Sequence, residues 1–133
     1  MGALIDSSVL IAAERDGLTL DALLARHAAE QATISAVSAS ELLHGVARAR
    51  SASQRHRRQQ FVEGLFSLLP VLPFDLLAAR VHARTWAKLA QAGSMVGERD
   101  LMIAATALSR DLLLITRDRR SFPRIPGLRI EFV

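Results

Sequence analysis

Apolar residues are spaced along this chain in two ways, and the spacing predicts which segments are helices and which are strands. Six segments place apolar residues three and four positions apart, as an amphipathic helix does. Between them lie short apolar runs that are typical of strands buried within a sheet. The predicted helices cover residues 8–15, 20–30, 38–50, 53–67, 76–92 and 97–111, and the predicted strands cover residues 3–5, 33–37, 69–74, 112–116 and 128–133.

The alternation of short strands with helices indicates the fold class. Strands joined by helical crossovers run parallel, and the helices then cover both faces of the sheet. We therefore expect an α/β fold with three α/β/α layers and a short parallel central sheet. The prolines in residues 69–74 place that strand at a sheet edge, and Asp75 and Gly93 are expected to cap the helix between them. Ligands of such folds bind beyond the carboxyl ends of the strands, where the strand order reverses.

Length and composition are those of one globular domain. The chain has 133 residues, of which 50% are hydrophobic and 23% are charged. It has no cysteine, which excludes disulfides, thiolate metal sites and a cysteine nucleophile. The longest uncharged apolar run, residues 64–74, is too short for a membrane span, and the first residues lack the basic charges of a signal peptide. We expect residues 1–133 to form a single domain located in the cytoplasm, with no membrane partner.

Positive charge is unevenly distributed and almost entirely carried by arginine. The net charge is +4, from 17 basic and 13 acidic residues, and Lys88 is the one lysine. Guanidinium groups suit bidentate contacts with phosphate, although such groups also occur on ordinary solvated faces. The arginines gather in two stretches, Arg48, Arg50, Arg55, Arg57 and Arg58 in the first and Arg117, Arg119, Arg120 and Arg124 in the second.

One acidic residue is predicted to face the interior, where an unpaired charge costs free energy. In the segment GERDLMIAATALSRD, Asp100 lies on or beside the apolar face of the predicted helix 97–111, because Ile103, Ala104 and Ala107 follow it at helical spacing. An unpaired charge that faces the interior is expensive. We therefore expect a compensating group near Asp100.

Three further acids follow predicted strands or begin helices: Asp6, Glu41 and Asp118. Each has a structural explanation, since Asp6 and Asp118 suit turn caps, Glu41 completes a capping box with Ser38, and Asp100 complements a helix dipole. A parallel sheet would nevertheless bring all four acids to one edge, where like charges require a counter-charge. Mg²⁺ or Mn²⁺ is a hard cation that carboxylate oxygens bind. An acidic metal centre with an arginine-rich rim suits phosphodiester hydrolysis.

Four segments carry a resemblance to a known family: LIDSSVLIA, SAVSASELLHG, GERDLMIAATA and LLLITRDRRSF. Their order and spacing resemble the motifs of PIN-domain ribonucleases. The short chain resembles in particular the VapC-type toxins of type II toxin–antitoxin systems, and PGLRIEFV is similar to the closing strand of that family. The resemblance implies a PIN-like nuclease domain over residues 1–133.

The resemblance assigns roles to particular residues. It implies that Asp6, Glu41, Asp100 and Asp118 are the catalytic and metal-binding acids, with Mg²⁺ or Mn²⁺ as the cofactor. Thr116 matches a threonine that hydrogen-bonds next to the metal ligands, and Ser7 stands where a serine or threonine is usual. Glu98 and His44 are further candidates, of which Glu98 also suits a helix N-terminus and His44 a plain surface position. Arg117, Arg119 and Arg120 are the candidate RNA-binding residues.

The resulting hypothesis is a metal-dependent endoribonuclease that acts as a toxin, leaves a 3′-hydroxyl and a 5′-phosphate, and is inhibited by a cognate antitoxin protein. The apolar helices 20–30 and 53–69 are candidates to line the antitoxin groove, and we expect a homodimer. Two alternatives remain open. One is a small Mg²⁺-dependent phosphatase with Asp6 as nucleophile, although that class usually has a second aspartate where this chain has Ser8. The other is a non-catalytic PIN module that binds RNA or protein.

Overall fold

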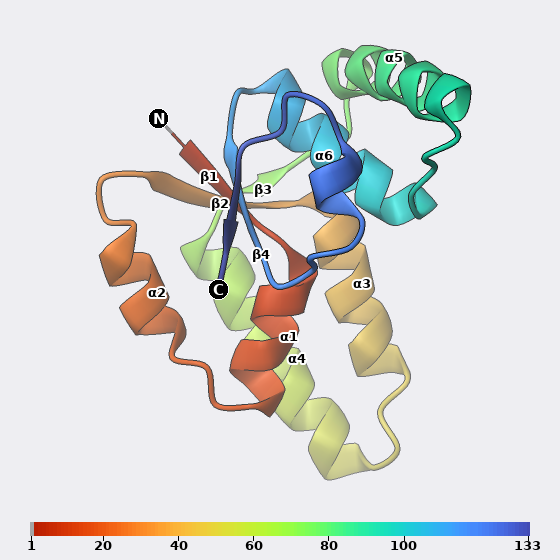
Figure 1. Cartoon of the computed structure of the whole chain (residues 1–133). Helices are drawn as coiled ribbons and strands as arrows, with labels where there is room; N and C mark the ends of the chain where they lie inside the picture. Colours follow the sequence, from red (N-terminus) through yellow and green to blue (C-terminus); the bar gives the residue numbers. More distant parts are fainter. Residues whose placement is uncertain (1) are drawn as a thin grey trace.

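A computed structural model describes residues 2–133, and it consists of one parallel sheet between two layers of helices (Figure 1). The five strands are ordered β3-β2-β1-β4-β5, and every neighbouring pair is parallel. This arrangement confirms the predicted three-layer α/β/α fold. The strands are β1 (Gly2–Ile5), β2 (Gln31–Ser35), β3 (Val71–Leu72), β4 (Leu113–Thr116) and β5 (Ile130–Phe132).

The helices divide between the two faces of the sheet. The first four pack on one face, and the last two pack against each other on the opposite face together with a short 3₁₀ turn, Phe122–Arg124. Among residues 2–133, no helix has the length and apolar character needed to cross a membrane. The α-helices are α1 (Ser7–Arg15), α2 (Leu20–Arg26), α3 (Ala36–Ala47), α4 (Ala52–Leu68), α5 (Leu76–Ala92) and α6 (Glu98–Ser109).

The central strand β1 supplies both halves of the hydrophobic core. Side chains alternate across a strand, so Ala3 and Ile5 face the layer of α1 and α4, while Leu4 faces the layer of α5 and α6. All three side chains are fully buried. The strand therefore has apolar residues at consecutive positions, and this explains why the run ALI predicts a strand of a parallel sheet rather than a half-exposed one.

Several predicted boundaries are wrong. The strand predicted over residues 33–37 ends at Ser35, and the next two residues already belong to α3. The capping box of Ser38 and Glu41 is also wrong, because the Oγ of Ser35 accepts the N–H of Ser38 at 2.9 Å and Ser35 is the N-cap. The helix predicted over residues 20–30 stops at Arg26 and is followed by a turn.

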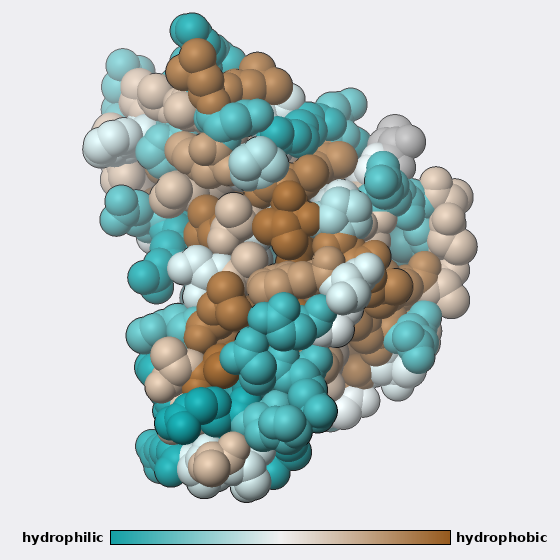
Figure 2. Space-filling view, turned by 180° about the vertical axis from the view of Figure 1, so that it is seen from behind, coloured by the Kyte–Doolittle hydropathy of each residue, from teal (hydrophilic) through white to brown (hydrophobic). Residues whose placement is uncertain are grey.

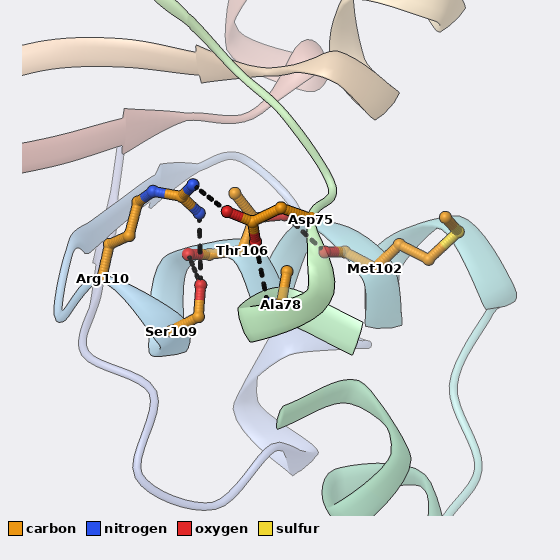
Figure 3. Close-up of polar contacts among 6 residues, drawn as sticks. All are labelled: Asp75, Ala78, Met102, Thr106, Ser109 and Arg110. Carbon is orange, nitrogen blue, oxygen red and sulfur yellow. Dashed lines mark hydrogen bonds and ion pairs between the residues drawn. The ribbon is translucent and has the colours of Figure 1, made fainter. Parts of the chain in front are cut away.

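The predicted caps of α5 are present, and one of them also joins α5 to α6. The backbone of Gly93 is left-handed, with a φ of 66°, at the end of the helix. At its start, the Asp75 carboxylate accepts the N–H of Ala78 at 3.0 Å and pairs with the Arg110 guanidinium at 2.8 Å (Figure 3). Arg110 also contacts the hydroxyl of Ser109 in the last turn of α6. These contacts fasten the start of α5 to the end of α6.

This link gives the folded protein a specific acid sensitivity. The bond from the Ala78 N–H, and then the charge of Arg110, hold the pKa of Asp75 below its usual range. A lowered pKa means that the charged carboxyl stabilises the fold above its unfolded-chain pKa of about 3.9 and that this stabilisation disappears as the pH falls through the folded-state value.

We therefore expect Asp75→Asn to lower the urea midpoint near neutral pH, because asparagine keeps the cap but loses the charge. The difference from wild type should shrink as the pH falls below the unfolded-chain value of about 3.9 and should close once the pH is below the folded-state pKa of Asp75. Urea unfolding across a series of acid pH values measures this difference. Asp16→Asn, at the exposed end of α1, is the matched control. A difference for Asp75→Asn that persists undiminished at acid pH would contradict the assignment.

Candidate active site

Two of the predicted acids lie at the point where the strand order reverses. The chain builds β1, β2 and β3 outward in one direction and then returns to add β4 on the other side of β1. Asp6 directly follows β1, and Asp118 lies two residues beyond β4. The N–H of Asp6 donates to the carbonyl of Ile115 at 2.9 Å, which fixes the two strand ends side by side. This is the place where open parallel sheets bind ligands.

Hydroxyl groups hold the Asp6 carboxylate in place. Its Oδ2 accepts the Ser8 hydroxyl at 2.6 Å and the Thr116 hydroxyl at 2.9 Å, and it lies 3.4 Å from the Ser8 N–H at the start of α1. Only 3% of Asp6 is exposed. Asp6 is thus both the N-cap of α1 and a fixed acid at the strand edge, so the structural explanation and the site hypothesis apply to the same geometry.

Glu41 reaches the same edge from α3. The hydroxyl of Ser7 donates to its Oε1 at 3.1 Å, which joins α3 to the start of α1. Burial raises the pKa of Glu41 above its usual value, and the negative charges of Asp6 and Asp100 raise it further. The bond from Ser7 and the charge of Arg99 act in the opposite direction. A carboxylate of α3 therefore lies within the electrostatic field of two other acids.

Asp100 lies in the first turn of α6, half-buried as the apolar pattern around it predicts. Burial raises the pKa of its carboxyl, a hydrogen bond with Ser121 lowers it, and the charges of Asp6 and Asp118 raise it. Asp118 itself accepts backbone N–H groups from Arg120 at 2.8 Å and from Ser121 at 3.3 Å. The loop after β4 thereby holds Asp118 and supplies Ser121 to Asp100.

Electrostatic effects link the four predicted acids, because Asp6 and Asp100 raise the pKa of Glu41, and Asp6 and Asp118 raise the pKa of Asp100. Within residues 2–133, no group of three or more acidic or histidine side chains is arranged so that it could hold a metal ion. The donor set nevertheless fits a hard divalent cation, because it consists of carboxylate and hydroxyl oxygens with no sulfur. A cation at this position would remove the mutual repulsion that the four carboxylates otherwise impose.

The remaining predicted residues lie around this cluster. Thr116 is fully buried and links Asp6 to the loop after β4, because its Oγ1 also accepts the N–H of Asp118 at 2.9 Å. Glu98 is exposed and lines a hollow with Asp100, whereas His44 is exposed on the outer part of α3. Arg117, Arg119 and Arg120 are exposed in the loop after β4, and the Arg119 guanidinium lies 4.4 Å from the centre of the Phe132 ring.

Two hydroxyl groups of this cluster could not be predicted from the sequence. The first belongs to Ser8, which donates to Asp6 and accepts the N–H of Arg117 at 3.1 Å. The second belongs to Ser121, which hydrogen-bonds to Asp100. The position of Ser8, two residues after an N-cap aspartate, is the one local signal. The contact of Ser121 has no such signal, because it joins residues from different elements.

Comparison with known proteins identifies the family. The family model for the PIN domain matches residues 3–128. Ribonuclease VapC of Rickettsia bellii is 33% identical over 98% of this chain and 95% of its own length. This chain belongs to the VapC ribonucleases of the PIN-domain family. A second relative, the tRNA(fMet)-specific endonuclease VapC of Salmonella typhimurium, is 42% identical over 74% of this chain and 72% of its own length.

Solved structures agree with this assignment. The DNA-bound VapBC structure of Salmonella typhimurium matches with a TM-score of 0.89 and 32% identity, over 99% of this chain and 98% of the other. A VapBC2 structure of Rickettsia felis has the same fold, with a TM-score of 0.88 at 23% identity. The chain is accordingly an endoribonuclease of the toxin class, as the sequence resemblance implies, and not a small phosphatase.

Proposed function

We propose that Asp6, Glu41, Asp100 and Asp118 hold Mg²⁺ or Mn²⁺ and that this centre hydrolyses RNA. One observation carries the proposal: the carboxylates of Asp6, Glu41 and Asp100 influence one another across three different elements at the point where the strand order reverses. A structural cap needs only one acid at each helix end. Mutual repulsion among acids is a cost that a bound cation explains.

The residues of the chain divide the work of such a centre. A bound divalent cation supplies charge stabilisation at the phosphate and lowers the pKa of a water molecule. The hydroxyls of Ser8 and Thr116 keep the Asp6 carboxylate oriented, and Ser7 does the same for Glu41. Glu41 completes the site or orients the attacking water. Glu98, which lines a hollow with Asp100, and His44 remain proposed participants at the margin of the site.

The proposed substrate is RNA, with Arg117, Arg119 and Arg120 contacting phosphates beside the acids. These arginines follow β4 directly and are exposed, so a strand lying across the strand edge meets them next to Asp118. Because the relative from Salmonella typhimurium is named a tRNA(fMet)-specific endonuclease, transfer RNA is the first substrate to test. The expected products carry 3′-hydroxyl and 5′-phosphate ends.

We propose further that a cognate antitoxin protein inhibits this chain in the cytoplasm. The matched structures from Salmonella typhimurium and Rickettsia felis are VapBC structures, in which VapC-type chains are accompanied by VapB. On this chain, α2 and α4 carry half-buried apolar residues that suit such a partner, among them Leu20, Leu24 and Phe61.

A second proposed partner is another copy of the chain. Helix α5 exposes 65% of Leu76, 52% of Leu77 and 53% of Trp86, and Figure 2 shows hydrophobic side chains at the molecular surface. Large exposed apolar residues on one helix favour an interface. Residues 1–133 would then act as one nuclease domain in a homodimer.

Expression in a bacterial host tests the toxin function. Wild type should arrest growth and degrade RNA, and Asp6→Asn should remove both effects because it lowers the negative charge of the site while keeping an N-cap residue. Asp16→Asn, the same change at the other end of α1, should remain toxic. Purification from the native cell should recover a small inhibitory protein bound to the chain. In a separate measurement, the purified 14.5 kDa chain should sediment as a dimer. Harmless, well-folded wild type without such an inhibitor would contradict the toxin function.

A further inference from the structure

A group of arginines lies at the end of the molecule where α1 and α3 end and α4 begins. Arg15 is the last residue of α1, Arg48 is the C-cap of α3, and Arg50 lies in the turn that leads to α4. Together with Gln54 and Arg58 of α4, they line a hollow that we call the arginine pocket. In Figure 1 this end of the molecule is the lower one, and hydrophilic side chains gather there in Figure 2.

The arginine pocket has little negative charge of its own. The Glu14 carboxylate lies 3.7 Å from the Arg15 Nε and 3.9 Å from the Arg58 Nε, and Arg58 also donates to the carbonyl of Gly45 at 2.8 Å. Within residues 2–133, the side chains of Arg48 and Arg50 form no ion pair. Four guanidinium groups therefore share one carboxylate, and the pocket retains a net positive charge.

A groove lies between this pocket and Glu41, one of the four acids. Its walls come from α1, α3 and α4, and Glu41, Gly45 and Phe61 line it together with Arg48 and Arg58, which also line the arginine pocket. Its lining is completed by Glu14, Arg15 and the apolar side chains of Ile11, Leu42 and Val62. Glu41 and Arg48 are seven residues apart in sequence and nearly two helical turns apart on α3, a distance of about 10 Å along the helix axis. An extended strand that has one phosphate at the acids can therefore place a later phosphate in the pocket.

The chemistry of the lining favours a phosphate over a protein segment. The pocket is lined by arginine and glutamine alone, so it offers no apolar surface for the hydrophobic face of a partner helix. Guanidinium groups match phosphate oxygens in bidentate geometry. Cations also stabilise helix C-termini, and this explains the arginines at the ends of α1 and α3. It does not explain Gln54 and Arg58, which lie in the first two turns of α4.

We propose that the arginine pocket is a second phosphate-binding site, which holds the RNA backbone away from the point of cleavage while the groove carries the strand between them. The inference rests on the proposed function, because it extends the path of the same substrate. It predicts that long substrates gain affinity from the pocket and that a dinucleotide, which cannot reach it, does not.

The test is the salt dependence of RNA binding. Arg48→Gln combined with Arg50→Gln removes two cations whose side chains form no ion pair within residues 2–133. Each phosphate contact to a single strand contributes about −0.7 to the slope of log K against log salt. Binding of a fluorescent single-stranded RNA is measured in EDTA so that the strand stays intact. The slope for the double variant should be shallower than the wild-type slope by about 1.4.

Matched variants separate this effect from general loss of charge or of folding. Arg80→Gln with Arg84→Gln makes the same charge change on exposed positions of α5 and should leave the slope unchanged. Arg48→Lys with Arg50→Lys keeps the charge and should restore most of the slope. With Mg²⁺ present, dinucleotide cleavage should be equal in all variants, whereas the KM for long RNA should rise only in the glutamine variant of the pocket.

Each failure has a distinct meaning. An equal slope for the pocket variant and wild type would overturn the inference, as would an equal loss in the α5 control. Loss of affinity for a partner protein with RNA binding unchanged would also overturn it and assign the pocket to that protein. Absence of metal-dependent cleavage in wild type would instead contradict the proposed function itself.

Discussion

Asp100→Asn should reduce RNA cleavage by more than about 100-fold, because changes to residues that merely support metal ligands already cost about 10–100-fold. The same substitution should raise the melting temperature of the metal-free protein. Burial and the charges of Asp6 and Asp118 disfavour the charged carboxylate of Asp100 in the folded state, and asparagine has the same shape without the charge. Activity and stability should therefore change in opposite directions.

Two measurements check this result, a cleavage assay with Mg²⁺ and thermal unfolding in EDTA. Asp16→Asn is the control that should change neither, since Asp16 is exposed at the far end of α1. Added Mg²⁺ should raise the melting temperature of wild type, because it binds the folded state, and should raise that of Asp100→Asn less. Full activity in Asp100→Asn would exclude it from the site.

The fold could be predicted from the sequence because its patterns are local and strong. Apolar runs such as ALI are buried on both faces, and α5 carries a capping aspartate and a terminal glycine at its two ends. The apolar spacing around Asp100 likewise indicated a carboxylate facing the interior, and Asp100 is half-buried. In each case neighbours within one or two turns determine the outcome.

The errors arise where local signals compete. Ser35 and Ser38 are both good N-cap residues, and the β-propensity of residues 33–37 favours the later one, yet β2 pairs with β3 only as far as Ser35. The helix α2 ends at Arg26 although the apolar spacing continues, and the next residue, His27, is buried between the carboxylates of Glu30 and Glu131. Tertiary contacts decided these boundaries.

The arrangement of the site could be predicted only in part. The four acids became candidates because Asp6 and Asp118 follow predicted strands, Asp100 opens a predicted helix, and Glu41 lies one turn into the predicted helix 38–50. The contact of Ser121 with Asp100 and the meeting of Arg15 with Arg50 required the packing of separate helices and loops, which spacing along the chain does not report.

RNA cleavage should disappear when divalent cations are removed. Without a counter-charge, the carboxylates of Asp6, Glu41, Asp100 and Asp118 repel the phosphate of the substrate as well as one another. The hydroxyl groups that orient Asp6 belong to the chain itself, so the fold should persist while the chemistry stops. This loss separates a metal-dependent hydrolase from a protein that merely binds RNA.

The most direct measurement is therefore cleavage of purified transfer RNA by the purified chain, first in EDTA and then with Mg²⁺ or Mn²⁺ in excess of the chelator. A metal-dependent nuclease should show only background cleavage in EDTA, recover with either cation, and leave products with 5′-phosphate and 3′-hydroxyl ends. Cleavage that continues undiminished in EDTA, or products with 2′,3′-cyclic phosphate ends, would contradict this prediction.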